Sequence, residues 1–526
     1  MVTTRAAVYS RKGGVATSQP LASSIGAAIL RAGGSAVDAG IAVSAALSVI
    51  EPGASQLGGD AFLITHDAKR KENYAFNGSG EAPHGATMDH FPNGIPLRGF
   101  KSSTVPGLVS TWFAAHEKYG RLNFQELLAP AIELADAGFP ANDGFIGRIK
   151  YHLTEASDTK LFDQLGISVD LSLGDLVKQP DLAKSLRAIA KEGREYFYKG
   201  AIAKALIEST NGWFDQSDLD KHFTRVISPL SVDYRGYKVH GQPPPSQGLI
   251  LMEELALVSG FDLASATTAD RIHLMVEAKK LAFEDRNRVL ADPEHLEVPI
   301  EQLFDANYLA KRRALINPKS ANNDEHSPNE GSDTTYFLVI DGEGNAVSWI
   351  QSVFHGFGAS WAIPGTGIVM NNRLTGFSLD PSSRNALAPG KRPAHTLNAW
   401  SVTDSNGALR FVGGTPGANI QVQSNFQLIT SLIDLKLPVQ EVVEAPRWQH
   451  LKGGDSSAID EAIKGTLYLE SRFGDEVVDQ LRHKGHEIEV LPPYGHGSAV
   501  QLLEIMENGT YALGSDPRCE GQAVGV

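Results

Sequence analysis

Two adjacent threonines stand where a polar segment meets an apolar one. Residues 321–333 read ANNDEHSPNEGSD, Thr334-Thr335 follow, and residues 336–340 are mostly β-branched or aromatic. We expect the polar segment to be exposed and mobile and the apolar run to be a strand that stops at a turn. If the chain is cut between Asp333 and Thr334, Thr334 becomes an N-terminal threonine that carries both a hydroxyl nucleophile and an amine base. The alternative is an ordinary loop that enters a strand.

A hydroxyl nucleophile also needs oxyanion donors and a group that orients its oxygen. The free α-amine of a new N-terminus, with a reference pKa of about 8, can be the base. Ser352 lies on the next predicted strand, so antiparallel pairing would bring its hydroxyl beside Thr334; a surface serine is the alternative. In the segment 413–418 (GGTPGA) a strand end turns into a helix. Backbone N–H groups there can stabilise developing negative charge, unless the turn is purely structural.

The elements that must position these residues differ before and after Thr334. The spacing of apolar residues predicts helices over 21–32, from Ser35 or Ala36 to about Glu51, and over 109–119, 124–137, 182–192, 249–259, 269–290, 420–434 and 473–484. Strands are predicted over 60–65, 234–239, 335–341, 346–353, 367–372, 397–403 and 409–413. The first part is rich in helices and the second part begins with a strand. This pattern indicates one layered α/β fold assembled from two segments.

Composition excludes several classes of protein. The chain has 526 residues, 42% of them hydrophobic, and a formal net charge of −14, which disfavours nucleic acid and anionic membranes as partners. The single cysteine, Cys519, excludes an intrachain disulfide, and the absence of metal-ligand motifs predicts neither a metal nor another cofactor. The N-terminus lacks the apolar core of a signal peptide, and Asp38 interrupts the most apolar stretch nearby. We therefore expect a cytoplasmic protein.

Ordered motifs along nearly the whole chain carry a resemblance to a known family. They are Ile29–Ala39, Leu57–Phe62, Val105–Gly107, Tyr234–Tyr237, Pro243–Ser246, Ala282–Arg286, Thr334-Thr335, Gly344–Val347, Asn371-Asn372, Lys391–Pro393, Pro416-Gly417 and Ser515–Arg518. With these motifs the chain resembles the proenzymes of the γ-glutamyltransferase (glutathione hydrolase) family, which belong to the N-terminal-nucleophile hydrolase superfamily. So many motifs in the right order are far more specific than any one of them.

The resemblance implies a fold, a processing step and an activity. The expected fold is a four-layer αββα sandwich with the new threonine at the end of a central strand. Cleavage of Asp333–Thr334 would give chains 1–333 and 334–526, which remain partners in one unit and form a possible dimer. Thr334 would attack an amide and form an acyl-enzyme. Ser352 occupies the place of a supporting threonine hydroxyl, and Gly417 and Ala418 occupy the place of two glycines that donate to the oxyanion.

The chain departs from the family pattern where the glutamyl group should be held. Met88 stands where an arginine grips the α-carboxylate, Gly376 replaces the acid that holds the α-amino group, and Phe354 replaces an asparagine. These losses remove a charged grip, since hydrogen bonds to charged groups contribute about 1.5–3 kcal/mol each. Met88 and Phe354 would instead make an apolar wall.

Other changes in the same region supply new polar groups. Arg373 replaces a glutamine and could hold a carboxylate in bidentate fashion, unless it forms a structural salt bridge. His395-Thr396 replace paired serines, and His395 could donate to substrate or simply hold the Thr396 loop. This set of changes is similar to the branch of oxamate amidohydrolase and cephalosporin-acylase-like enzymes.

The sequence therefore predicts a self-processing N-terminal threonine amidohydrolase that acts on a small amide substrate. Its acyl group is expected to be non-standard: a carboxylated group of the oxamate kind, or an apolar one. One alternative is a true glutathione hydrolase or γ-glutamyl transferase with a rebuilt clamp. Another is an uncleaved, non-catalytic binding protein, because Tyr336 and Leu338 depart from the family signature around the nucleophile.

Overall fold

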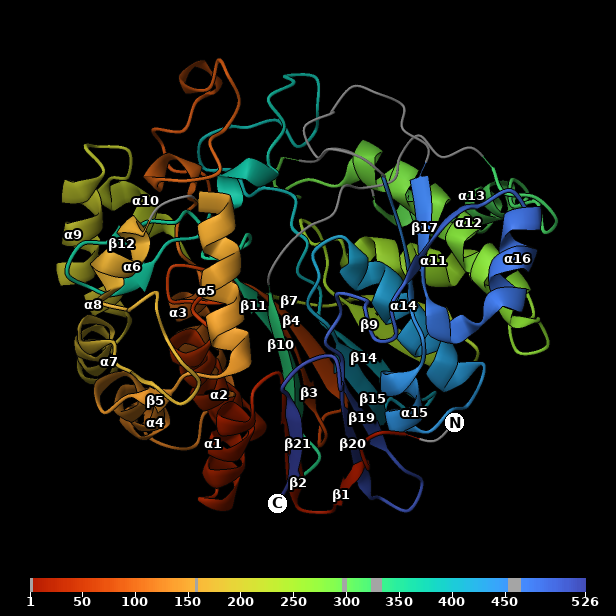
Figure 1. Cartoon of the computed structure of the whole chain (residues 1–526), viewed down its shortest axis with the longest axis horizontal. Helices are drawn as coiled ribbons and strands as arrows, with labels where there is room; N and C mark the ends of the chain where they lie inside the picture. The colour runs from red at the N-terminus through yellow and green to blue at the C-terminus, as the bar shows by residue number, and fades with distance from the viewer. Residues whose placement is uncertain (1–2, 157–158, 296–299, 323–333, 453–464) are drawn as a thin grey trace.

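Two seven-stranded antiparallel sheets pack face to face, and a layer of helices covers the outer side of each (Figure 1). The computed structural model describes residues 3–156, 159–295, 300–322, 334–452 and 465–526. The first sheet has the order β21 (Gln522–Gly525), β2 (Gly13–Thr17), β10 (Thr335–Asp341), β11 (Ala346–Ser352), β3 (Asp60–Asp67), β4 (Glu72–Asn77), β7 (Arg225–Ile227). The second has the order β1 (Val8–Ser10), β20 (Tyr511–Ser515), β19 (Gln501–Ile505), β15 (Leu409–Gly414), β14 (Trp400–Thr403), β9 (Tyr237–Gly241), β8 (Leu230–Tyr234). The predicted four-layer sandwich is confirmed.

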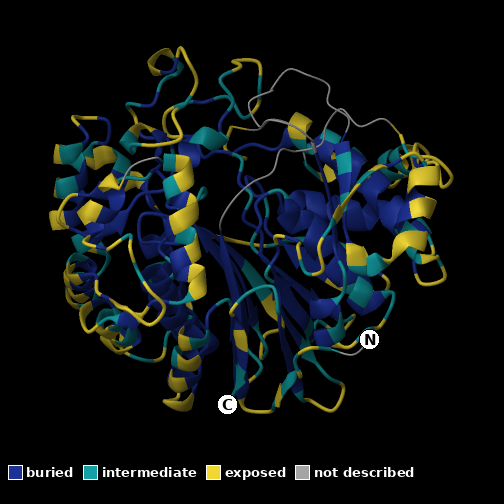
Figure 2. Cartoon of the chain, viewed as in Figure 1, coloured by how far each residue is buried: buried dark blue, intermediate teal, exposed yellow. Residues whose placement is uncertain are grey.

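Strand β10 is apolar along its whole length because both of its faces are covered. Side chains alternate between the faces of a strand. Tyr336 and Leu338 pack between the two sheets, while Phe337 and Val339 pack against the helices behind the first sheet. Every residue of β10 is buried, and most of the central strand surface is dark blue in Figure 2. The continuous apolar run is thus the mark of a central strand between two layers.

The helices behind the first sheet come from the chain before Thr334. The main ones are α1 (Pro20–Arg31), α2 (Ala36–Ile50), α3 (Leu108–Tyr119), α4 (Phe124–Asp136), α5 (Asp143–Ala156) and α7 (Pro180–Glu192). Ser35 caps α2 and forms a capping box with Asp38, so the start of this helix is fixed by local chemistry. All residues of α2 are buried, which explains its alanine-rich sequence.

The helices behind the second sheet come from both parts of the chain. They are α11 (Gly248–Val258), α12 (Thr268–Val289), α13 (Ala306–Arg313), α14 (Ile420–Ile433), α15 (Val439–Glu444) and α16 (Asp475–His483). A small sheet of β16 (Trp448–Lys452), β17 (Gly465–Glu470) and β18 (Glu487–Leu491) lies beside them. Their apolar side chains form a second core with the outer face of the second sheet.

Two predictions of local structure are wrong. Residues 234–239 are not one strand, because Arg235 and Gly236 have φ of +52° and +85° and make the tight turn between β8 and β9. The predicted strand 367–372 shortens to β13 (Ile368–Val369).

The start of the polar segment is held in place, unlike the mobile segment that we expected. Asn322 N donates to Glu277 of α12 at 3.0 Å, and Ala321 N donates to the carbonyl of Lys484 at 2.7 Å. Lys280 of α12 donates to the carbonyl of Asn322 at 2.9 Å. The remainder, 323–333, lies outside the described residues.

Strands from before and after Thr334 alternate within the sheets. In the first sheet β10 and β11 lie between β2 and β3, and in the second sheet β14 pairs with β9 and β20 pairs with β1. The two segments therefore share every layer except the helices behind the first sheet. Within the described ranges, no helix combines the length and the apolar character needed to cross a membrane.

Candidate active site

Thr334, Ser352 and Asp60 form a row across three neighbouring strands of the first sheet. Thr334 directly precedes β10, Thr335 pairs with Gln351, and Ser352 pairs with Asp60 at the start of β3. Because Tyr336 faces the second sheet, side chains two residues away on the same strand face it as well. The Thr334 hydroxyl donates to Ser352 Oγ at 3.4 Å, and Ser352 Oγ also accepts from Phe354 N at 2.8 Å.

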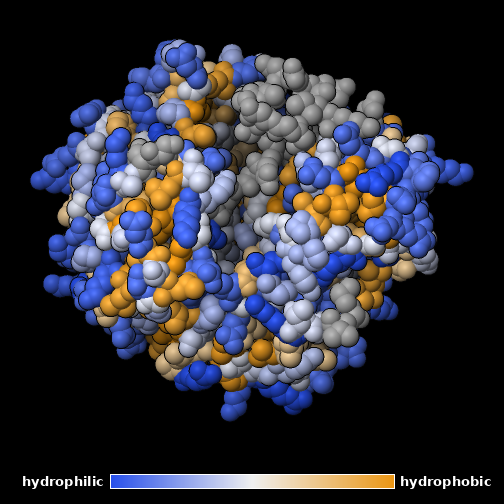
Figure 3. Space-filling model, in the orientation of Figure 1, coloured by the Kyte–Doolittle hydropathy of each residue, from blue (hydrophilic) through white to orange (hydrophobic). Residues whose placement is uncertain are grey.

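Both hydroxyl residues are buried in the uncut chain, with Thr334 3% and Ser352 1% exposed. The alternative of a surface serine is therefore wrong. The predicted pairing of the two hydroxyls is present, whereas Asp333, the other half of the predicted cleavage site, lies outside the described residues. On the face seen in Figure 3, the surface is hollowed between the two halves that carry the helical layers.

Asp60 holds two of the residues that the sequence singled out. Its Oδ2 lies 3.3 Å from Arg373 Nε and 3.1 Å from His395 Nε2, and its Oδ1 accepts from Gly80 N at 3.1 Å. His395 Nδ1 accepts from Leu397 N at 3.2 Å, so the ring proton sits on Nε2 and points at Asp60. Burial, aided by the charge of Arg373, lowers the pKa of His395 to about 4, so the ring is neutral. Both ring nitrogens are occupied within the protein, which favours the reading that His395 holds its loop.

Arg373 forms the structural salt bridge that was one of its two readings, yet part of its guanidinium remains available. Nη1 makes only a long contact of 3.4 Å with Thr396 Oγ1, and Nη2 has no hydrogen-bond partner among the residues of the structure that are described. The Phe354 ring covers one face, with its centroid 4.0 Å from the guanidinium carbon. Burial lowers the pKa of Arg373 to about 10, and Asp60 acts in the opposite direction. The Nη1–Nη2 edge is thus a donor pair of the kind that binds carboxylates.

Phe354 has a strained backbone, and Met88 is half-buried. Phe354 has φ of +85°, which is rare for a bulky residue, and strain of this kind clusters at functional sites. Met88 begins a short 3-10 helix (Met88–His90) and packs, half-buried, against the core behind the first sheet. A common apolar wall of Phe354 and Met88 remains a prediction.

The turn Gly417–Ala418 presents two backbone amides. Gly417 has φ of +122° and Ala418 has φ of +43°. In the described part of the chain neither amide donates a hydrogen bond, although the carbonyls accept from Ile420 N and Gln421 N at the start of α14. Gln247 Nε2 donates to the carbonyls of both Ala418 (2.7 Å) and Thr396 (2.9 Å), which ties this turn to the Arg373 side of the site. Free amides at a helix N-terminus suit an oxyanion.

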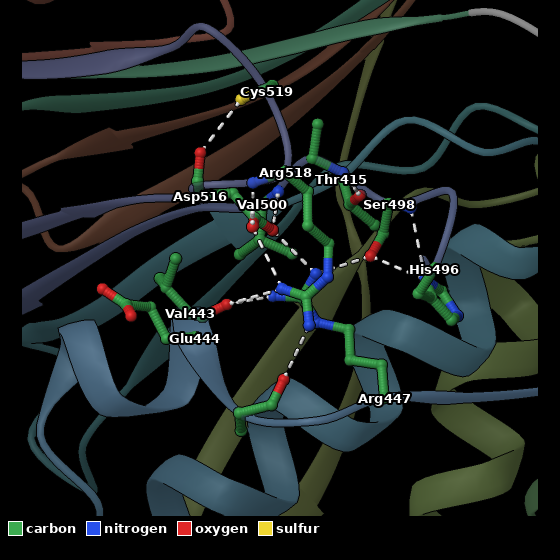
Figure 4. A network of polar contacts seen from close by, with 12 residues as sticks. Thr415, Val443, Glu444, Arg447, His496, Ser498, Val500, Asp516, Arg518 and Cys519 are labelled. Atoms are coloured by element: carbon green, nitrogen blue, oxygen red, sulfur yellow. Dashed lines mark hydrogen bonds and ion pairs between the residues drawn. The ribbon is translucent and has the colours of Figure 1, made fainter. Parts of the chain in front are cut away.

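A buried polar network contacts Thr415, two residues before the turn (Figure 4). Arg447 donates to Asp516 at 2.7 Å and to Ser498 at 2.6 Å, and Val500 N donates to Asp516 at 2.9 Å. Between Ser498 and Val500, Ala499 N donates to Thr415 Oγ1 at 3.0 Å. Burial alone would raise the pKa of Asp516, but the guanidinium groups of Arg447 and Arg518 outweigh it and lower that pKa. The motif Ser515–Arg518 is thus linked through Val500 and Ala499 to Thr415, at the start of the segment that leads into the turn.

Sequence reasoning missed Asp60 and Gln247 as parts of the site. Asp60 was visible as a lone carboxylate at the head of an apolar strand, directly after Gly58-Gly59. An unpaired charge at the start of a buried strand is a signal that a cation lies opposite. For Gln247 no comparable signal exists, because its role depends on two loops distant in sequence.

Comparison with known proteins finds relatives along nearly the whole chain. The model of the gamma-glutamyltranspeptidase family matches residues 22–526. The chain belongs to this family. It is 36% identical over 522 residues to the glutathione hydrolase-like YwrD proenzyme of Bacillus subtilis, covering 96% of this chain and 97% of the relative.

Two further family members resemble this chain over their full lengths. The oxamate amidohydrolase proenzyme of Klebsiella pneumoniae is 34% identical over 527 residues, which is 96% of this chain and 97% of the relative. The crystal structure of cephalosporin acylase from Bacillus halodurans superposes with a TM-score of 0.91 at 34% identity, covering 100% of this chain and 98% of that one. Gamma-glutamyltranspeptidase-family members of this kind are named for different substrates, so the family alone does not assign one.

Proposed function

We propose that this chain is a self-processing N-terminal threonine amidohydrolase. The peptide bond Asp333–Thr334 is cut, and the products 1–333 and 334–526 remain together as one enzyme. The observation that carries the proposal is the buried hydroxyl pair Thr334–Ser352 at the head of a central strand. The names of the relatives, which are proenzymes of hydrolases, support the same reading.

Each group at the site has a role in the proposed reaction. The free α-amine of Thr334 takes the hydroxyl proton as Oγ1 attacks the amide carbon, and Ser352 orients that oxygen. The amides of Gly417 and Ala418 stabilise the oxyanion. The C–N bond then breaks, the amine leaves with the proton, and an ester to Thr334 remains. Water, or an acceptor amine, attacks the ester and regenerates the enzyme.

The acyl group that fits this site best is small and carries a carboxylate. The Nη1–Nη2 edge of Arg373 would bind that carboxylate, with Thr396 beside it and Phe354 closing one side. Oxamate has this form, and a relative is named for it. An apolar acyl group against Phe354 and Met88 is the second candidate, supported by the similarity to a cephalosporin acylase.

Processing is tested by mass spectrometry of the wild type, Thr334→Ser and Thr334→Ala after long incubation. We expect two polypeptides, the smaller beginning at residue 334, from the wild type and from T334S, and one intact chain from T334A. An intact wild-type chain would contradict the proposal and leave a non-catalytic binding protein.

The substrate class is tested with oxamate and oxamide, which differ only in the carboxylate, beside glutathione, a γ-glutamyl anilide and a glutaryl amide. R373M should lower kcat/KM for oxamate by about tenfold or more, the value of a charge-assisted hydrogen bond, and spare oxamide. The double variant D60N/R373M is the matched control, because it removes both charges of the pair. Equal losses on both substrates would make Arg373 purely structural, and efficient turnover of the γ-glutamyl anilide would favour a rebuilt glutamyl clamp.

A further inference from the structure

Arg286 lies beside the candidate oxyanion turn but has no part in the reaction as described so far. It stands in the last turn of α12, within the motif Ala282–Arg286. Its Nη1 donates to Asn419 Oδ1 at 2.8 Å, and its guanidinium carbon lies 4.8 Å from the centroid of the Phe283 ring. Asn419 directly follows Ala418 and is the N-cap residue of α14. Two contacts thus fix a guanidinium next to the turn.

This guanidinium has no counterion among the residues that the structure describes. Other arginines around the site have one, as Arg373 has Asp60 and Arg447 has Asp516. The acidic neighbours of Arg286 are engaged elsewhere: Glu284 pairs with Arg312 at 2.7 Å, and Asp285 pairs with Arg288 at 2.6 Å.

Within the described ranges, no carboxylate pairs with Arg286. Burial lowers its pKa to about 10, and among the described residues no acidic group acts in the opposite direction. Keeping an uncompensated cation in such surroundings is costly, and such groups cluster at binding sites. Arg286 as a whole is only partly buried.

Contacts connect the turn to both guanidinium groups. Gln247 joins the carbonyl of Ala418 to that of Thr396, whose hydroxyl contacts Arg373. Ala418 is followed by Asn419, which contacts Arg286. With Arg373 assigned to the acyl part of an amide whose carbonyl oxygen meets the turn, Arg286 is the cation left for the amine part.

We propose that Arg286 binds a carboxylate on the amine side of the scissile amide. The substrate class is then an N-acyl amino acid with a carboxylate on each side of the amide, such as an N-oxalyl amino acid. Hydrolysis adds water across the C–N bond and gives a dicarboxylate and a free amino acid, with no other reactant. This inference rests on the proposed function.

The test compares N-oxalylglycine with N-ethyloxamate, which lacks the amine-side carboxylate, on the processed enzyme. The wild type should prefer N-oxalylglycine, and R286Q should lower kcat/KM for it by about tenfold or more while leaving N-ethyloxamate within about twofold. The matched control is R288Q, because Arg288 lies on the same helix, is largely exposed and already pairs with Asp285. No preference in the wild type, or equal losses on both compounds in R286Q, would overturn the inference.

A binding measurement separates this inference from the reaction. If the processed enzyme hydrolyses neither compound, the proposed function fails, and both compounds are then titrated by calorimetry. Weaker binding of N-oxalylglycine alone in R286Q would still support Arg286 as its carboxylate partner. Absence of binding to the wild type, or the same affinity in R286Q, would contradict it.

Discussion

At the scale of single residues, the charge of Asp60 organises the acyl side of the site. Its carboxylate contacts Arg373, a neutral His395 and the backbone amide of Gly80. The sequence predicted Arg373 and His395 as members of the site from their positions in family motifs. Asp60 carried a local signal of its own, but its pairing with these two residues could not be predicted from local pattern, since Asp60 lies on a strand that precedes both by much of the chain.

Removing the charge of Asp60 should destabilise the protein. Asp60→Asn keeps the shape but leaves Arg373 buried without a counterion, which costs about 3–5 kcal/mol for a broken buried pair. In D60N/R373M neither charge remains, so most of the loss should be recovered. Calorimetric melting of the uncut T334A background compares the variants as single polypeptides. This view of the pair would be contradicted if D60N had the melting temperature of its parent, or if the double variant melted no higher than D60N.

A second buried carboxyl predicts how stability changes with pH. Glu254 of α11 is fully buried, and its oxygens have no hydrogen-bond partner in the described part of the chain. Burial raises its pKa well above the ordinary 4.5, against the opposing charge of Lys279. The folded state then holds a proton that the unfolded state releases. As the pH rises above the pKa of the unfolded state, this group therefore lowers the free energy of unfolding by up to about 1.4 kcal/mol per pH unit.

Glu254→Gln should therefore gain stability over the parent as pH rises from 5 to 8, and the gain should vanish below the unfolded pKa of the carboxyl. Melting temperatures of both proteins across this range give the difference. The exposed Glu476→Gln is the control, for which we expect no such growth. A difference in melting temperature between E254Q and its parent that does not change with pH would contradict a protonated Glu254.

At the scale of elements, the turn from β15 into α14 combines two positive φ angles with two amides that donate to no group in the described part of the chain. The sequence predicted this turn from its glycines. By contrast, the hairpin at Arg235-Gly236 was read as a strand, because the aromatic and apolar residues around it resemble strand sequence and the usual Asn-Gly pair is absent. Turns in glycine-rich segments can thus be predicted from the sequence, whereas a turn with a single glycine inside an apolar segment is missed.

Two neighbouring substitutions in this turn should differ in their effect on activity: the first should lower it and the second should preserve it. Gly417→Ala places a Cβ at φ of +122° and 2.5 Å from Ile420, so the turn must distort and amide hydrolysis should fall about a hundredfold. Ala418→Gly keeps both amides and relieves a left-handed residue, so it should retain activity and stability. Steady-state kinetics and melting curves check both. Normal activity in G417A would exclude these amides as oxyanion donors.

At the scale of the whole molecule, local patterns predicted many of the helices but missed strands such as β2, β19 and β20, and they predicted only the pairing of β10 with β11. Val8 pairs with Leu513, and β10 lies between β2 and β11. Contacts between such distant positions leave no periodic signal in one sequence, and only the family resemblance supplied the four layers. The same resemblance predicted a single unit from two segments, and the alternation of their strands in both sheets gives that expectation a physical basis.

This alternation predicts different refolding before and after the cut. In the uncut chain the two segments are covalently joined, so they meet at a high effective concentration; once cut, they must find each other by diffusion. After denaturation in urea and dilution, T334A should recover its original melting temperature at any protein concentration. The processed enzyme should recover in a yield that rises with concentration, measured by activity. Equal, concentration-independent recovery of both would contradict this expectation.

The interleaved strands also set the order of folding, cleavage and catalysis. The peptide bond that joins the two segments during folding is the one that must break for catalysis, so assembly comes before the release of the nucleophile. From then on the native state depends on the height of its unfolding barrier, because separated segments regain it only by meeting in solution. The working lifetime of each molecule is thus set mainly by how long the shared sheets stay closed.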